Sequence, residues 1–435
     1  MADSRSISRI FTAKLILACL SVVTGVIVAR TLGPGGKGEY ALIVLVASMT
    51  AGLTTLNIGE STVFFFSRRE IAFGPLLVSN AAFILATSLS SCSVLALLWY
   101  RGLLPWQGLE HPEAILFVCA LIPLIFFQNH VRDLVRSTRR FSLFNLLLLL
   151  QPTVYLSLVL VFVVLLAKGV RGAVLAAVIA NAMSVFVGVF ALLRLEKPSR
   201  FYFDFSYLRK AIGYGLRGHI GNIFQRFNLR VDQLFIPVLW GSAMLGHYSV
   251  AVALSEMIWH VPDAIGIVTL PRISGGREED GAILTARSVR ICGLITLTFV
   301  LLFAVGARAG VLLLYGEAYR PAIRAVYFLL PGVFFMSLSK ILSKYFSGVG
   351  RPEINTGTAF VALVATLGFC VALIPRYGMI GAALASSVAY GLRASFDIAL
   401  FLRLSNVRGR ELFMVDSSDL SLLRGLLGRE TPVSQ

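Results

Sequence analysis

The chain has 435 residues, of which 57% are hydrophobic and only 14% charged, and 39 Lys and Arg against 22 Asp and Glu residues give a net charge of +17. This composition, with a mean hydropathy of +0.82, excludes a soluble globular protein, which typically carries about 25% charged residues, and a disordered protein, which is poor in apolar residues. The basic excess does not indicate nucleic-acid binding, because the basic residues lie between long apolar runs. A polytopic membrane protein is expected.

The first apolar run, from Ile10 to Val28, is too long for the core of a signal peptide and lacks a cleavage pattern, so it predicts a transmembrane helix. A helix needs about 20 mostly apolar residues to cross the bilayer. Runs of this kind predict an all-α protein with twelve spans, over residues 10–30, 41–66, 75–100, 113–130, 143–166, 172–194, 211–238, 245–268, 287–307, 321–346, 355–375 and 379–403. The fourth run is short and ends in Gln128-Asn129-His130.

The cysteines all lie inside apolar runs, and the sequence has no CxxC pair or Cys/His cluster. Neither a disulfide framework nor a metal site is expected, and no cofactor is predicted.

The distribution of Lys and Arg predicts the orientation. About three quarters of those that flank the spans fall on the side that holds both chain ends, and short cytoplasmic loops are enriched in such residues. Both termini are therefore expected in the cytoplasm, with the chain in the inner (plasma) membrane of a bacterium.

Local patterns recur at a nearly constant offset of about 210 residues, which indicates an internal repeat. The clearest pairs are Leu32-Gly33-x4-Gly38-x-Tyr40 with Trp240-Gly241-x4-Gly246-x-Tyr248, and Gly169-x-x-Gly172-Ala173 with Gly378-x-x-Gly381-Ala382. The prediction is two six-helix halves related by a pseudo-two-fold axis along the membrane normal, with a substrate site between them. The predicted parts are 1–194, a basic cytoplasmic linker 195–210, 211–403 and a cytoplasmic tail 404–435. A duplicated scaffold without transport is the alternative.

Several stretches resemble the polysaccharide-biosynthesis flippases of the multidrug/oligosaccharidyl-lipid/polysaccharide exporter superfamily. They are Ala29-Arg30-Thr31-Leu32-Gly33-Pro34 with Gly38 and Tyr40, Asn228-Leu229-Arg230-Val231-Asp232-Gln233, Tyr315-Gly316-Glu317 with Tyr319 and Pro321, and Ile374-Pro375-Arg376-Tyr377-Gly378. The resemblance implies translocation of a lipid-linked oligosaccharide, typically on undecaprenyl diphosphate, within membrane lipid and beside other polysaccharide-assembly proteins. One departure is Ile236-Pro237-Val238-Leu239, which replaces a glycine-containing end of the pattern.

The seventh span carries the strongest candidate site. His219, Arg226 and Arg230 fall within about 20° of one line on a continuous helix, with Asn222 about 60° away. Ionised residues at membrane depth cost about 2.5–3.5 kcal/mol each on insertion scales, so a cationic cavity is expected. The planar fork of arginine suits a diphosphate. The alternative is a structural pairing of these arginines with Glu60 or Glu256.

Other polar residues extend this candidate site. Asn57 and Glu60 lie in the second span. Glu256 and His260 are four residues apart in the eighth span and are therefore neighbours on one helix face. This carboxylate and imidazole would carry coupling protons, contact sugar hydroxyls, or only join helices. Na+ is the other candidate coupling ion. Asp232 has an open role, and Asp263 is expected to be solvated.

Three further basic residues, Arg9, Lys14 and Arg217, are expected to ring the cytoplasmic mouth, either to capture phosphate or to anchor the helices.

No catalytic triad, metal-ligand spacing or phosphate-binding loop occurs in the sequence, so an enzyme is not expected. The first span lacks a carboxylate between Ile10 and Ala29, which argues against a cation-coupled drug exporter of the same superfamily. That exporter remains the nearest alternative, followed by an integral-membrane glycan polymerase or glycosyltransferase.

Overall fold

The computed structural model describes residues 4–104, 113–138, 140–197, 200–405 and 407–414, except for the side chains of residues 4–15, 141 and 413. Helices and their connections make up this part of the chain, and no strand occurs in it. The expected all-α class is confirmed. The amphipathic stretch from Leu420 to Leu427 lies outside the described residues.

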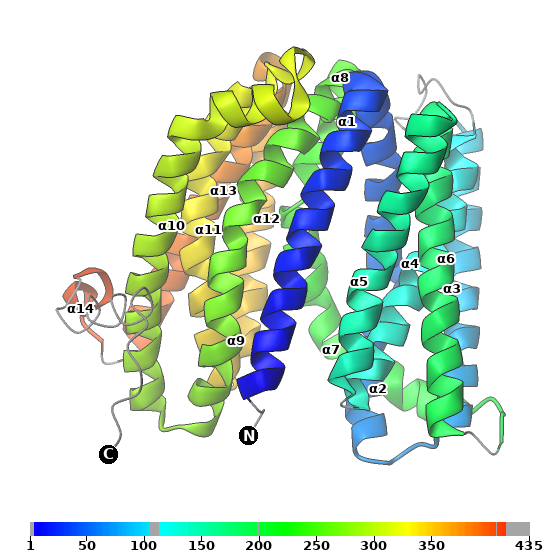
Figure 1. Ribbon diagram of the computed structural model, residues 1–435. Coiled ribbons are helices and arrows are strands. Elements are labelled where there is room, and N and C mark those ends of the chain that lie inside the picture. Colours follow the sequence, from blue (N-terminus) through cyan, green and yellow to red (C-terminus); the bar gives the residue numbers. More distant parts are fainter. Residues whose placement is uncertain (1–3, 105–112, 139, 198–199, 406, 415–435) are drawn as a thin grey trace. The chain divides into compact units, whose positions relative to one another are not determined.

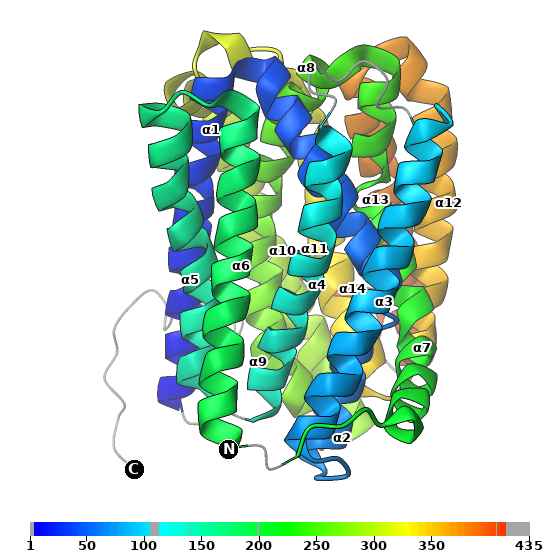
Figure 2. The same ribbon diagram turned by 90° about the vertical axis from the view of Figure 1, so that its right-hand side faces the viewer.

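The chain forms two compact units. Unit 1 consists of Met1–Val250 and Val311–Pro321. Its helices are α1 (Ser4–Thr54), α2 (Ile58–Ser67), α3 (Phe73–Tyr100), α4 (Ala114–Ser137), α5 (Phe141–Val159, continued by a π-helical turn Leu160–Leu165), α6 (Gly169–Glu196), α7 (Phe205–Asn228) and the first part of α8 (Val231–Glu256). Within it, α4 and α5 both pack against α6 (Figures 1 and 2).

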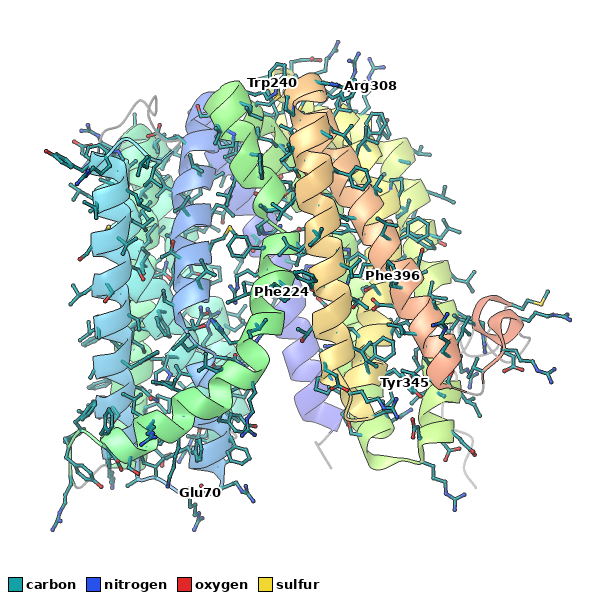
Figure 3. The ribbon with its side chains drawn as sticks, turned by 180° about the vertical axis from the view of Figure 1, so that it is seen from behind. Glu70, Phe224, Trp240, Arg308, Tyr345 and Phe396 are labelled. Atoms are coloured by element: carbon teal, nitrogen blue, oxygen red, sulfur yellow. The ribbon has the colours of Figure 1, made fainter. Side chains whose placement is uncertain are left out.

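Unit 2 consists of Ala251–Gly310 and Ala322–Gln435. Its helices are the end of α8, a 3-10 turn Met257–Trp259, α9 (His260–Gly275), most of α10 (Glu278–Tyr315), α11 (Ala322–Gly348), α12 (Pro352–Tyr377), α13 (Met379–Leu404) and α14 (Gly409–Phe413). Its core includes Tyr345, labelled in Figure 3, whose ring packs edge-on against that of Phe401 at 4.9 Å between centroids.

Two glycines allow single helical segments to contain two spans. Gly33 in α1 has φ 65° and ψ 179°, and Gly241 in α8 has φ 79° and ψ 175°. This region of backbone conformation is essentially restricted to glycine. Both residues stand at the same position of the repeated pattern, so the two copies have nearly the same backbone conformation at this position.

The repeated patterns also contact each other inside unit 1. A Cβ on Gly38 would overlap the carbonyl oxygen of Ser242, and a Cβ on Gly246 would overlap that of Pro34. Pro34 corresponds to Ser242 in the repeat, and Gly38 corresponds to Gly246, so the contact is reciprocal. We call Pro34, Gly38, Ser242 and Gly246 the glycine clamp. The two backbones can approach because Gly38 and Gly246 have no side chains.

The predicted spans are present in the described residues. Nine helical segments are long and apolar enough to cross a membrane, and two of them, Ile16–Thr54 and Phe205–Gly275, contain the reversals at Gly33 and Gly241. The remaining span is α13, whose 26 residues include Arg393 and Asp397. The twelve-span architecture is therefore confirmed.

The fourth span is longer than expected, because its polar residues are buried inside unit 1. α4 continues beyond His130 to Ser137. Gln128 and His130 are buried, and the His130 Nε2 atom lies 3.3 Å from the Asn80 amide nitrogen. Packing within the unit thus accommodates the polar run that was expected to end the helix.

The seventh span is not one α-helix through Arg230, as the predicted alignment of its polar residues assumed. α7 ends at Asn228, and α8 begins at Val231 after the turn Leu229–Arg230. The Arg230 side chain donates to the Leu229 carbonyl oxygen at 3.1 Å, which satisfies an acceptor at a helix end. Figure 3 shows the bend near Phe224, with Trp240 at the far end of α8's first arm.

The two compact units do not coincide with the two halves predicted from the internal repeat. The halves 1–194 and 211–403, the linker and the tail therefore stay a prediction from the sequence; residues 198–199 of the linker and 415–435 of the tail lie outside the described part.

A buried ion pair in unit 2 allows a stability prediction. Asp397 and Arg393 on α13 have exposed side-chain fractions of 0% and 4%, and Ser339 on α11 donates to the same carboxylate. Removing one partner of such a pair leaves a buried charge. We expect Asp397→Ala to destabilise the protein by about 3–5 kcal/mol.

The measurement is thermal unfolding in detergent, with Asp263→Ala as the matched control. The Asp263 carboxylate is 45% exposed and pairs with Lys340 at 3.0 Å, so its loss should cost only about 0–1 kcal/mol. Equal losses of stability in the two variants would contradict the expectation that the buried ion pair matters more than the exposed one.

Candidate functional site

One face of α7 packs against the end of α1 and the start of α2. Ser61 donates to the Ala211 carbonyl oxygen at 2.6 Å, and a Cβ on Gly215 would overlap the Leu56 carbonyl oxygen. One turn further, the buried His219 ring places Nε2 2.9 Å from the Leu53 carbonyl oxygen. Because these α7 residues are four apart, they share a face.

Asn57 lies in the break between α1 and α2. Its backbone is left-handed, with φ 56°, a conformation that asparagine adopts more readily than most residues. The exposed Asn222 on α7 donates from Nδ2 to the Asn57 side-chain oxygen at 3.4 Å. The break in the second predicted span thus faces the polar part of α7.

Arg226 is the exposed cation at this place. Its guanidinium lies over Gly52 of α1, where a Cβ would come within 2.6 Å of Nε. Among the described residues it makes no hydrogen bond and no ion pair. A glycine beneath it leaves room for the flat guanidinium and keeps its donors accessible.

The predicted cationic line holds only in part. His219 and Arg226 both lie against Leu53 and Gly52 of α1, as their spacing of seven residues predicts, but His219 is buried and hydrogen-bonded. Arg230 lies in the turn between α7 and α8, so the helical geometry that aligned it with the others does not extend to it. Arg217 is exposed on α7 and has no partner in the described part of the chain.

Glu60 is engaged by an arginine of another helix. Its Oε1 atom lies 3.0 Å from Arg136 on α4, and Arg136 also contacts Asp133 at 3.3 Å. This places Glu60 in an ion pair other than the pairing with the arginines of the seventh span that was considered from the sequence.

Asp232 joins the two arms of α8. It is 2% exposed in the first turn of that helix, accepts a hydrogen bond from the Tyr248 hydroxyl, and also accepts from the Gln233 backbone N–H at 2.8 Å. The bond from Tyr248 connects the chain across the reversal at Gly241.

Glu256 and His260 belong to unit 2 and do not lie on one uninterrupted α-helix. The 3-10 turn Met257–Trp259 separates them, and His260 is exposed. The predicted i, i+4 geometry of a continuous helix is therefore not observed.

Trp259 in that turn is buried and donates to the Val333 carbonyl oxygen at 3.2 Å, while the Lys340 ammonium lies 4.8 Å from its ring centroid. Asp263, which was expected to be solvated, pairs with the same lysine. Arg9 and Lys14 lie in α1, but their side chains are outside the described part of the structure.

Sequence reasoning missed the contacts of the Ala29–Tyr40 stretch. Arg30 donates through Nε to the Leu314 carbonyl oxygen at 2.7 Å and through Nη2 to that of Leu313, at the end of α10, and Tyr319 donates to the Ala29 carbonyl oxygen at 3.0 Å. Two of the stretches that carry the family resemblance thus touch inside unit 1. Tyr319 and Ala29 are 290 residues apart in the chain, and no local pattern in the sequence indicates their contact.

Comparisons with known proteins agree on family and fold. The family described as "Polysaccharide biosynthesis protein" matches residues 27–324. A Shigella flexneri protein named as a candidate O-antigen transporter is 22% identical over 394 residues, covering 87% of this chain and 93% of that protein.

Two solved structures share the fold. The lipid II flippase MurJ in an inward closed conformation superposes with a TM-score of 0.78 at 13% identity, over 98% of this chain and 94% of that one. An inward-facing multidrug resistance transporter superposes with a TM-score of 0.72 at 16% identity, over 92% and 98%. At these identities the likeness concerns the fold alone.

Proposed function

This chain belongs to the family of polysaccharide biosynthesis proteins, and we propose that it is a flippase for a lipid-linked oligosaccharide. The headgroup, a sugar on a diphosphate of the undecaprenyl type, would move from the cytoplasmic to the outer leaflet while the polyprenyl tail stays in lipid. Alternating access between the two predicted halves would carry it. The protein would act as a transporter and not as an enzyme.

Arg226 carries this proposal. It lies in the segment Phe205–Gly275, which is apolar enough to cross the membrane, and it is exposed without a partner in the described residues. Where such a segment crosses the hydrocarbon, an arginine is costly and needs an anion or water. A diphosphate provides that anion, and a guanidinium donates to it with two parallel N–H groups.

The other candidate residues would have different roles. Arg217 and Asn222 are exposed on the same helix and would contact the headgroup, whereas His219 would position α7 through its bond to α1. Arg230 remains a candidate for the cationic cavity, and Arg9 and Lys14 for the cytoplasmic mouth. Candidates for sugar contacts or for coupling to protons or Na+ remain Asn57, Glu60, Glu256, His260 and Asp232. Both termini would face the cytoplasm of a bacterial cell.

The proposal is tested by deleting the gene in its own host and complementing it. We expect the deletion to abolish the surface polysaccharide and to leave its oligosaccharide on undecaprenyl diphosphate in the cytoplasmic leaflet, because assembly continues without transfer. The measurement combines glycan gels with mass spectrometry of the extracted lipid. An unchanged glycan together with lost resistance to a toxic cation would instead identify a drug exporter.

A further inference from the structure

A small, partly open cavity with both polar and apolar walls lies in unit 1, between the two arms of α1 and helix α5. Its volume is about 270 Å³, slightly below the range of about 300–1,000 Å³ that is usual for small-molecule sites. The polar part of its wall consists of Ser21, Thr24, Lys37, Tyr40, Gln151 and Tyr155. This size suits a single sugar ring and not an oligosaccharide.

Three groups on this wall have no partner in the described residues. The Lys37 ammonium has no ion pair or hydrogen bond and lies 5.5 Å from the centroid of the Tyr40 ring. The Tyr155 hydroxyl is buried without a hydrogen bond, and the Gln151 amide also makes none. Buried polar groups normally find partners, so the buried Tyr155 hydroxyl, with the half-buried Lys37 and Gln151 beside it, indicates a polar occupant.

The tyrosines hold this wall in place. The rings of Tyr40 and Tyr155 stack with 6.3 Å between centroids and 10° between planes. Aromatic pairs in this distance range stabilise packing beyond the area they bury. The hydroxyl of Tyr155 and the ammonium of Lys37 are thus presented from two helices, α5 and α1, that pack against each other.

The charge of the occupant follows from the charge of the wall. The cavity offers one cation and, among its lining residues, no carboxylate. A lysine ammonium is a compact point charge, which matches one carboxylate, whereas a diphosphate would bring more negative charge than one lysine balances. An amide and a hydroxyl beside the ammonium match the hydroxyl groups of a sugar.

We propose that this cavity is a binding site for a carboxylate-bearing monosaccharide, a sugar acid of the uronate class. The Lys37 ammonium pairs with the carboxylate, and Gln151 and Tyr155 bond the ring hydroxyls. That the sugar acid is a residue of the transported glycan rests on the proposed function; the binding itself does not.

The test uses the full-length protein in lipid nanodiscs with D-glucuronate, D-glucose and inorganic phosphate as probes. The rate at which an amine-reactive reagent acylates Lys37 is read by peptide mass spectrometry, with Lys168 as an internal control. Lys168 also lies over an aromatic ring, that of Phe162 at 5.6 Å, but it does not line the cavity. We expect glucuronate to slow acylation of Lys37 about tenfold, because its carboxylate would pair with the ammonium and keep the reagent away. The acylation rate of Lys168 should not change.

Calorimetric titration of variants provides a second measurement. Lys37→Met should weaken glucuronate binding about tenfold or more, because a charged hydrogen bond is lost, while Lys168→Met should bind normally. Equal protection by glucose, protection by phosphate alone, or normal binding in Lys37→Met would overturn the proposal. Because neither readout requires transport, a failure of the flippase proposal would show separately, in the polysaccharide of the deletion strain.

Discussion

Replacing Arg226 by alanine is expected to abolish surface polysaccharide while the protein still inserts into the membrane at its normal level. The guanidinium is exposed on α7, lies over Gly52 and has no partner among the described residues, so its removal breaks no hydrogen bond or ion pair in the described part of the fold. It does remove the cation that would meet the diphosphate. A charged hydrogen-bonding group of this kind contributes about 1.5–3 kcal/mol, and polysaccharide output should fall at least about tenfold.

Two further variants sharpen this test. Arg226→Lys keeps the charge but loses the two-pronged donor, so we expect intermediate output. Gly52→Ala keeps the arginine but places a Cβ within 2.6 Å of its Nε, which forces the side chain to move and should also reduce output.

The matched control is Arg320→Ala. Arg320 forms an exposed ion pair with Glu317 at 2.8 Å, which contributes about 0–1 kcal/mol, and normal polysaccharide is expected. Glycan gels and quantitative blots of membrane fractions measure output and insertion. Wild-type glycan in Arg226→Ala would refute its assignment to the substrate path.

The fold was largely predictable because its main signals are local. Apolar runs give the spans, and the pattern around Gly33 and Gly241 marks two reversals whose backbone needs glycine. The break at Leu229–Arg230 was not predictable, because it depends on an arginine that bonds a freed carbonyl oxygen. The span predicted from hydropathy for α4 also ended too early, because hydropathy does not show that Gln128 and His130 are buried inside the unit.

The candidate site was less predictable because its chemistry depends on partners from other helices. The α7 spacing correctly placed His219 and Arg226 on a common side, yet only the structure shows that the imidazole bonds the Leu53 carbonyl oxygen. Glu60 pairs with Arg136, which lies 76 residues away. By contrast, Arg393 and Asp397 are four residues apart on one helix, and this spacing alone would have predicted their pairing.

The glycine clamp offers the second large effect. Gly38→Ala, Gly246→Ala and the double variant each add a methyl group where a backbone carbonyl oxygen of the opposite arm already lies. Both overlapping atoms belong to the backbone and not to a flexible side chain. The two arms of the clamp, which are the part of α1 after Gly33 and the part of α8 after Gly241, must therefore separate. Overpacking of this kind typically costs about 1–3 kcal/mol. If transport requires the arms to approach and part in alternation, the variants should insert but produce at least about tenfold less polysaccharide.

Gly35→Ala is the matched control, because it lies beside the clamp in the same turn and a Cβ there has nothing within 4 Å. Separation of the arms is measured in a cysteine-free background by the rate at which a membrane-impermeant maleimide labels Ser242→Cys. Labelling should accelerate about tenfold in Gly38→Ala and stay unchanged in Gly35→Ala, since only the former shifts the population toward the parted state. Normal glycan and normal labelling in Gly38→Ala would mean that the close approach of the two repeats is packing without a role in transport. Fast labelling with lost glycan would make the clamp a contact that must close in every transport cycle.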